Sequence, residues 1–195
     1  LFNTHLLWRS TMGLFGFGSK KEKTAAAGKN DPFSLSGPAG VASAKCILTA
    51  GVRGVEMDVN LSGGDQVTMT HGPVTIEGAN AIIAYLDIKG EGMSLRPKKA
   101  RLLADQYCWV EVALNLLDKG EKVELVLNKM NDVLGSQEFL VGPLSLADAL
   151  VAGSVLTIKK NGGLPAGLDN VDAWLTRVEQ KIPENLRANA ISNVN

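Results

Sequence analysis

The ten residues from Phe139 to Asp148 constrain the fold of this chain more than any other stretch. An apolar run and a Gly-Pro turn lead into Ser145, and Asp148 follows three residues later. This spacing lets the serine hydroxyl accept the backbone N–H of Asp148 while the carboxylate reaches back to the N–H of Ser145. The segment therefore predicts a capping box at the start of an apolar helix that continues to Ile158.

The composition is typical of a soluble globular protein. Of the 195 residues, 45% are hydrophobic and 21% are charged, enough for one sizeable core or two small ones. Basic and acidic residues both number 20, so no net charge attracts the chain to nucleic acid or to acidic membranes. No apolar run reaches the roughly 18 residues of a membrane-spanning helix.

The Cys and His residues give no sign of a metal or redox site. Cys46 and Cys108 lie among apolar residues, outside any metal-binding or redox spacing, and His5 and His71 are far apart in the sequence. We expect no bound metal. The two thiols are predicted to be reduced core residues of a protein in a reducing compartment.

Residues 1–30 differ in character from the rest of the chain. The first 21 contain three cations and no acid, which resembles either a transit segment or sequence upstream of a start at Met12. We interpret residues 1–30 as a tail, either flexible or engaged in docking. Its aromatic side chains are candidates for contact with a partner or a membrane surface, namely Trp8, Phe15 and Phe17.

Residues 31–89 predict the order strand, helix, three strands, helix. Polar and apolar residues alternate from Val55 to Asn60, which is the period of a half-buried strand. Two apolar runs flank His71-Gly72-Pro73 and predict a hairpin. The other expected elements are a strand over 33–36, a helix over 41–50 ended by Gly51 and Gly54, hairpin strands over 67–70 and 74–76, and a helix over 79–86.

Beyond a linker at 90–97, the apolar periodicity is helical up to residue 186. The first helix carries an apolar stripe of Leu103, Tyr107, Val110, Leu114 and Leu117. Further helices are expected over 123–134, from Leu146, and over 171–182, where the apolar positions are Trp174, Leu175, Val178 and Ile182. Residues 187–195 are interpreted as a tail.

Three segments resemble glutathione transferases. Ala81 to Leu86 is similar to the third helix of that family, 139–148 to its buried capping box, and 168–175 to a late helix of its C-terminal domain. The resemblance covers residues 31–186. It implies an α/β plus all-α fold, with a thioredoxin-like βαββα domain over 31–89 followed by an all-helical bundle of the transferase C-terminal type over 98–186.

The resemblance also implies where a catalytic side chain would lie. Active members of the family place a Tyr, Ser or Cys after the first strand, where it activates the sulfur of glutathione. The serine-type position falls near Gly40, which carries no hydroxyl. Ser36 and Ser43 are the nearest candidates for a catalytic role.

Two glutathione-binding positions of the family also differ in this sequence. The cis-proline that precedes the third strand falls at Val67, and a valine strongly prefers the trans peptide. Pro73 is the alternative if the loop is rearranged. The Glu-Ser pair that binds the γ-glutamyl end falls at Gly78 and Ala79, with Glu77 one residue early.

These departures favour a non-catalytic interaction subunit that needs no cofactor. The resemblance is then to the gamma subunit of the translation elongation factor 1 complex and to domains appended to aminoacyl-tRNA synthetases, or the chain belongs to an organellar complex. An active transferase that binds glutathione and conjugates it to electrophiles remains the alternative, so the question of enzymatic activity stays open.

The same reasoning predicts the partners and the compartment. We expect other protein subunits in a homo- or hetero-oligomer, nucleic acid only indirectly, and peripheral membrane contact only through the N-terminal tail. The predicted compartment is the cytoplasm, with mitochondria or plastids as the alternative because the first 21 residues contain no acid.

A short basic cluster opens the first helix of the bundle. Lys98, Lys99 and Arg101 follow Arg96, and cations at a helix N-terminus are mildly unfavourable. The cluster is either a solvated face or a contact with an acidic partner or tRNA.

Overall fold

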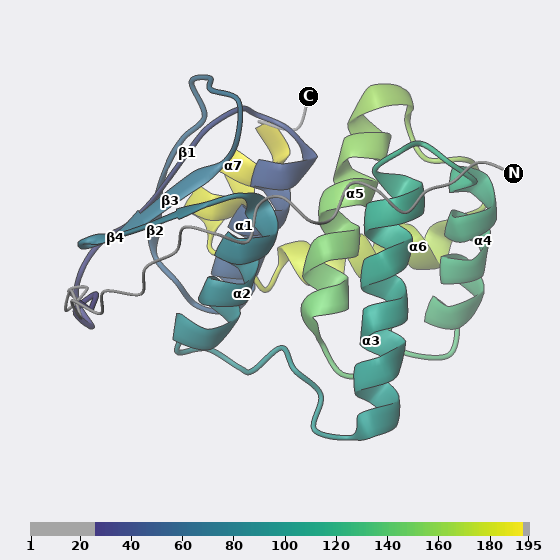
Figure 1. Cartoon of the computed structure of the whole chain (residues 1–195). Coiled ribbons are helices and arrows are strands. Elements are labelled where there is room, and N and C mark those ends of the chain that lie inside the picture. Colours follow the sequence, from purple (N-terminus) through teal and green to yellow (C-terminus); the bar gives the residue numbers. More distant parts are fainter. Residues whose placement is uncertain (1–25, 193–195) are drawn as a thin grey trace, which may run out of the picture.

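The computed structural model describes residues 26–192 as two packed domains (Figure 1). A four-stranded sheet with its helices forms one domain, and a bundle of helices forms the other. The expected docking aromatics Trp8, Phe15 and Phe17 lie outside the described residues. Within 26–192, no helix has the length and the apolar character needed to cross a bilayer.

The sheet has the strand order β2-β1-β3-β4. β1 pairs in parallel with β2 and antiparallel with β3, and β3 and β4 form a hairpin. The strands are β1 (Phe33–Ser36), β2 (Met57–Asn60), β3 (Thr68–His71) and β4 (Val74–Glu77). The order of elements expected from the alternating pattern is confirmed.

Two helices, α1 (Val41–Val52) and α2 (Ala79–Lys89), pack on each other and cover the sheet (Figure 1). The sheet side chains beneath them include Leu35 and Met69, both fully buried. Gly51 lies inside α1 rather than ending it. A Cβ there would come within 2.4 Å of the Ile182 side chain. The missing side chain thus lets the chain beyond α6 pack closely on α1.

The C-terminal residues form a helix where a tail was expected. α7 (Glu184–Ser192) packs against α1 and reaches β2, with Leu186 and Ala190 buried. The prediction of a tail from residue 187 is therefore wrong at least as far as Ser192. Two apolar residues four apart are too few to mark a helix in a sequence, but they are enough to dock one onto a formed core.

The second domain is the expected helical bundle, with α5 at its centre (Figure 1). α5 packs against α3, α6 and η1, and also against α1 of the other domain. The elements are α3 (Ala100–Val112), the π-helical turn η1 (Ala113–Leu117), α4 (Val123–Leu134), α5 (Leu146–Gly162) and α6 (Asp169–Glu179).

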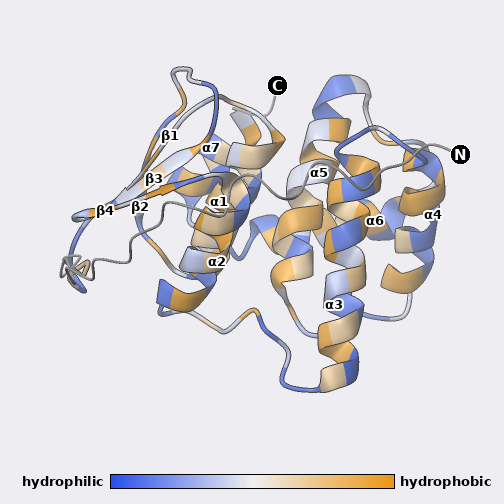
Figure 2. Cartoon of the chain, viewed as in Figure 1, coloured by the Kyte–Doolittle hydropathy of each residue, from blue (hydrophilic) through white to orange (hydrophobic). Residues whose placement is uncertain are grey.

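The apolar stripe predicted along the first bundle helix is only partly buried. Leu117 is buried, but Tyr107 is 53% exposed and its neighbour Gln106 is buried instead. The buried positions of α3 and η1 are Gln106, Ala113 and Leu117, so Tyr107 lies beside the buried face and not on it. Hydrophobic segments consequently remain visible along α3 in Figure 2.

An ion pair with a buried lysine joins the two domains. Lys45 on α1 is 2% exposed and binds Asp118, which follows η1. The Ser154 hydroxyl of α5 donates to the other carboxylate oxygen of Asp118 at 2.6 Å. Burial lowers the pKa of Lys45, and the hydrogen bond and charge of Asp118 oppose that shift. Gly153 leaves room for this contact, since a Cβ there would lie 2.7 Å from Cγ of Lys45.

Candidate ligand site

The positions that the resemblance implies for glutathione meet at one end of the sheet. Ser36 at the end of β1 pairs with Thr68 at the start of β3. The N–H of Gly78, which precedes α2, donates to the carbonyl of Val67 at 2.8 Å. The start of α1 follows β1 by four residues, so its first turn adjoins the same end. The fold therefore assembles the backbone of a ligand site, and the side chains decide its chemistry.

Ser43 has no free hydroxyl. Its side chain is fully buried, accepts the N–H of Gly40 at 3.0 Å and donates to the carbonyl of Gly40 at 2.8 Å. The residue thus closes the first turn of α1 on itself. A hydroxyl engaged in this way is not available to a glutathione sulfur in the described arrangement.

Ser36 is the accessible candidate. It is exposed, and its hydroxyl makes one long hydrogen bond of 3.5 Å to the carbonyl of Thr68. It lines an open cavity of about 450 Å³ together with Gly37 and residues 62–66. No cationic side chain lines this cavity, so nothing there lowers a thiol pKa by charge.

The loop from β2 to β3 lies over the end of β1. The N–H of Gly63 donates to the carbonyl of Gly37 at 3.4 Å, and a Cβ on Gly37 would come within 2.7 Å of the Gln66 carbonyl oxygen. The Gln66 side chain donates to a carboxylate oxygen of Glu77 at 2.9 Å. The carboxylate nearest the expected γ-glutamyl position is therefore already engaged by the protein.

The two remaining family positions carry no ligand-binding side chain. Val67 is 3% exposed, and none of the peptide bonds in residues 26–192 is cis. Pro73 lies in the β3–β4 turn, at the far end of β3 from Val67, so its assignment as the cis-proline is wrong. Ala79 opens α2 behind Gly78, with no side-chain cap on the helix.

The two thiols have different environments. Cys46 is fully buried beneath α2, and burial raises its pKa to about 12. Cys108 is exposed on α3, so its prediction as a core residue is wrong. Both are free thiols. Neither lines the cavity beside Ser36, and the described residues contain no cluster of His, Cys, Asp or Glu that could hold a metal.

Sequence reasoning missed a larger cavity at the opposite end of the sheet. It has a volume of about 1080 Å³ and lies between the starts of β1 and β2 and the N-terminus of α7. His71 lines it and is buried, with Nδ1 2.9 Å from the Tyr85 hydroxyl and its ring stacked on Phe33. Several separate segments build this cavity, so no local motif marks it in the sequence.

The basic cluster lies away from both cavities. Lys98, Lys99 and Arg101 are exposed at the start of α3, beyond the connector that leaves α2. The structure therefore does not bring them to the implied glutathione position.

Sequence comparisons do not find a relative. No family model matches the chain, and no curated protein matches it.

Solved structures match over most of the chain. A theta class glutathione S-transferase from Xanthomonas axonopodis pv. citri, with glutathione bound, is 15% identical with a TM-score of 0.65, over 83% of this chain and 97% of its own. A delta-class glutathione transferase from Nilaparvata lugens is 20% identical with a TM-score of 0.68, over 83% and 96%.

A solved beta-etherase structure also matches over most of the chain. The beta-etherase LigF from Sphingobium sp. strain SYK-6 is 16% identical with a TM-score of 0.63, over 82% of this chain and 97% of its own. The agreement extends over both domains, and the identity is too low to carry any residue role across. The chain has the fold of the glutathione transferases.

Proposed function

We propose that the protein is a non-catalytic interaction subunit of a multiprotein assembly. The observation that carries this proposal is the first turn of α1, where Ser43 binds Gly40 and no free hydroxyl or thiol is presented. Thiol transfer needs a group that stabilises the glutathione thiolate. Without one, the fold retains its surfaces but lacks the activating side chain.

The helical domain offers surface for such contacts. Two large apolar side chains lie in the open on successive helices, Tyr107 on α3 at 53% exposure and Leu125 on α4 at 67%. Trp109 and Val110 on α3 are only partly buried. Large apolar side chains in the open are available for contact with another protein.

One observation favours a second candidate, an active glutathione transferase. Ser36 is exposed and lines a cavity at the correct end of the sheet, and the structural matches include enzymes. On this hypothesis a shift of Ser36 toward α1 would place its hydroxyl beside the thiol of a bound glutathione. The first hypothesis is simpler because it needs no rearrangement of β1.

A glutathione titration separates the two candidates. We expect no heat of binding when reduced glutathione is titrated into the purified protein by calorimetry, and no turnover of an electrophilic aryl halide. Binding in the micromolar to low-millimolar range, together with turnover that Ser36→Ala abolishes and Ser43→Ala does not, would establish the enzyme. The Ser36→Ala variant must keep the wild-type circular dichroism spectrum for this result to count.

Copurification tests the assembly itself. Affinity purification of the full chain at native abundance is expected to yield a partner in fixed stoichiometry, and chromatography of the pure chain to give its own oligomeric state. A chain that elutes alone, and that also binds glutathione, would contradict the proposal.

A further inference from the structure

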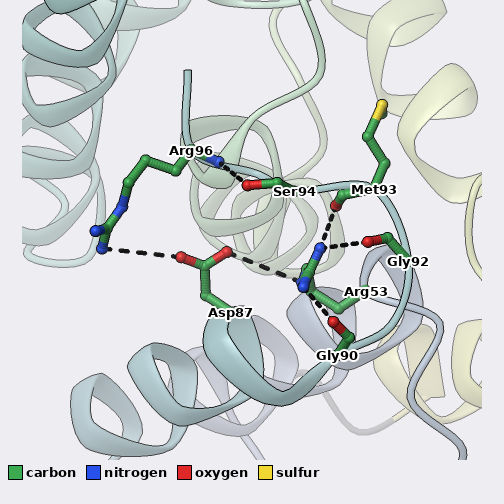
Figure 3. A network of polar contacts seen from close by, with 7 residues as sticks. All are labelled: Arg53, Asp87, Gly90, Gly92, Met93, Ser94 and Arg96. Atoms are coloured by element: carbon green, nitrogen blue, oxygen red, sulfur yellow. Dashed lines mark hydrogen bonds and ion pairs between the residues drawn. The ribbon is translucent and has the colours of Figure 1, made fainter. Parts of the chain in front are cut away.

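A buried arginine binds the first residues of the connector between the domains, residues 90–97. Arg53, at the end of α1, is 5% exposed, and its guanidinium donates to the carbonyls of Gly90, Gly92 and Met93 (Figure 3). In return, the N–H of Gly92 donates to the carbonyl of Arg53 at 2.9 Å. Asp87 lies beside the same guanidinium, with 3.9 Å between the nearest atoms.

The two glycines of the connector allow this close packing. A Cβ on Gly90 would lie 2.5 Å from Cβ of Arg53, and one on Gly92 would lie 2.8 Å from the carbonyl carbon of Arg53. Real side chains do not approach this closely, so the backbone of the connector rests directly on the end of α1.

The other end of the connector is fixed to the bundle. Leu95 is fully buried, and its carbonyl accepts the N–H of Leu146 at the start of α5 at 3.1 Å. The connector is therefore held by both domains, and the side chains between its two anchors are presented in a defined place.

Two large apolar side chains next to these anchors remain in the open. Met93 is 61% exposed, and Ile88, near the end of α2, is 76% exposed. The Met93 backbone is held by Arg53, so its exposure does not come from a loose loop.

Four cations follow immediately in the sequence. Arg96, Lys98, Lys99 and Arg101 are all exposed, and residues 92–104 contain no acid. Arg96 lies 4.0 Å from a carboxylate oxygen of Asp87, and Arg101 pairs with Asp105 at 3.1 Å. Lys98 and Lys99 have no ion-pair partner among the described residues, as the ion pairs of that part of the chain involve other cations.

The start of α3 adds further positive potential at the same place. Lys99 is its N-cap residue, no side chain caps the helix, and the first turn contains no acid. The free N–H groups and the helix dipole both favour an anion there. Within the fold, cations at this position are unfavourable, so the fold itself gives no reason for the cluster.

We propose that this connector surface, formed by Ile88, Met93, Arg96, Lys98, Lys99 and Arg101, docks an acidic segment of a partner protein that carries apolar side chains among its carboxylates. The carboxylates bind the cations and the start of α3, and the apolar side chains cover Met93 and Ile88. Because the connector is already fixed, docking orders little of this chain.

The surrounding charges favour a narrow segment over a membrane. Glu91 and Asp105 flank the connector surface, both exposed or partly so, and the whole chain carries no net charge. An extended anionic membrane would face these acids as well as the cations, whereas a single peptide segment lies between them.

This inference rests on the proposed function, for which it names the surface and the chemistry of the partner. The two can fail separately. Glutathione turnover would contradict the proposed function whatever the connector surface binds, and loss of peptide binding would overturn the surface in a protein that still ignores glutathione.

The test uses the full chain and two labelled synthetic peptides of equal charge, one of Glu interspersed with Leu and one of Glu interspersed with Ser. Fluorescence anisotropy is expected to show tighter binding of the Glu/Leu peptide. The Lys98→Glu/Lys99→Glu variant should weaken it about tenfold. Met93→Ser should weaken it about threefold and leave the Glu/Ser peptide unchanged.

Matched variants elsewhere serve as controls. Lys119→Glu/Lys129→Glu changes the net charge by the same amount, and Ile191→Ser removes an exposed apolar side chain from α7. Both should bind the Glu/Leu peptide as the wild-type protein does.

Three results would overturn the proposal. The first is equal binding of both peptides with no effect of Met93→Ser, which indicates charge alone. The second is tighter binding to vesicles of phosphatidylserine and phosphatidylcholine than to the peptide, which indicates a membrane surface. The third is no peptide binding by a protein with the wild-type circular dichroism spectrum.

Discussion

The first turns of α1 and α5 differ in the chemistry of their side chains. At the start of α5, Asp148 is fully buried and accepts four hydrogen bonds, including one from the Trp174 indole at 2.9 Å. At the start of α1, Ser43 binds only Gly40 within its own turn. The start of α5 is hydrogen-bonded to other parts of the bundle, whereas the hydrogen bonds of Ser43 stay within the first turn of α1.

This contrast indicates that the residues that stabilise the fold and the residues that would activate a thiol lie at different helix starts. The Asp148 carboxylate joins the start of α5 to Leu140 and to α6 and so fixes the bundle. Burial raises its pKa, and the hydrogen bonds oppose that rise. The start of α1 presents no free hydroxyl, and the hydrogen bonds of Ser43 do not reach the bundle.

Removing Asp148 should have the largest effect. Asp148→Ala leaves the Trp174 indole, two backbone N–H groups and the Ser145 hydroxyl without their acceptor in the core. We expect a loss of about 4 kcal/mol in the free energy of unfolding, since each buried unsatisfied donor carries a penalty. Urea denaturation followed by tryptophan fluorescence measures it.

Ser43→Ala is the matched change at the other helix start. It removes a hydroxyl with two local hydrogen bonds and should cost about 1 kcal/mol, as for an ordinary cap. Ser145→Ala should fall near the same value. Equal losses for Ser43→Ala and Asp148→Ala would contradict the contrast between the two sites.

The next largest effect is expected at the middle of α1, where Lys45 fixes it to the bundle. Asp118→Leu leaves the buried Lys45 cation without its carboxylate, and we expect a loss of about 3 kcal/mol in the free energy of unfolding. The double variant Lys45→Met/Asp118→Leu should recover most of that loss, because the buried charge goes with its partner. A double variant as unstable as the single one would show that α1 depends on packing at this point and not on the ion pair.

The fold could be predicted from local patterns because each pattern has a local cause. The alternation from Val55 to Asn60 and the spacing of Ser145 and Asp148 follow from strand period and helix capping. The sequence did not indicate Trp174 as the partner of Asp148, since they are 26 residues apart and meet only in the folded bundle. Tyr107 was wrongly placed on the buried face, because that face runs through its polar neighbour Gln106.

The candidate site was predictable only as a set of positions. The missing hydroxyl at Gly40 and the missing proline at Val67 can be seen in the sequence, but the occupation of Ser43 depends on the φ and ψ angles of Gly40. The anchoring role of Arg53 is likewise invisible locally, because its acceptors lie 37 to 40 residues later.

The thiol of Cys46 offers a smaller, pH-dependent test of how closed the contact between α1 and α2 is. Its pKa is raised from 9.0 to about 12, so above pH 9 the unfolded chain loses a proton that the folded protein keeps. The protonated Cys46 thiol therefore makes its full contribution to the free energy of unfolding below pH 9, and this contribution is lost as the pH rises toward 12.

The comparison with Cys46→Ala isolates this contribution. At pH 10 the wild-type protein should lose about 1.4 kcal/mol more than the variant, each relative to its own value at pH 8. Other groups such as Lys45 titrate in both proteins and cancel. Parallel pH profiles would mean that the thiol ionises in the folded state and that solvent reaches the region beneath α2.

The smallest effect expected is at Gly40, and it separates backbone from side-chain control of the same turn. Gly40 has a φ of +152° with nothing within 4 Å of a Cβ placed there, so Gly40→Ala meets no atom and strains only the backbone. The expected cost is about 1 kcal/mol. Gly162→Ala, in the last turn of α5 and also with open space, should be neutral or stabilising because alanine favours a helix.

If Gly40→Ala behaves like Gly162→Ala in urea denaturation, the turn tolerates a side chain. A serine at that position could then be introduced without strain, and the absence of a hydroxyl at the start of α1 would reflect the choice of residue and not the geometry of the chain.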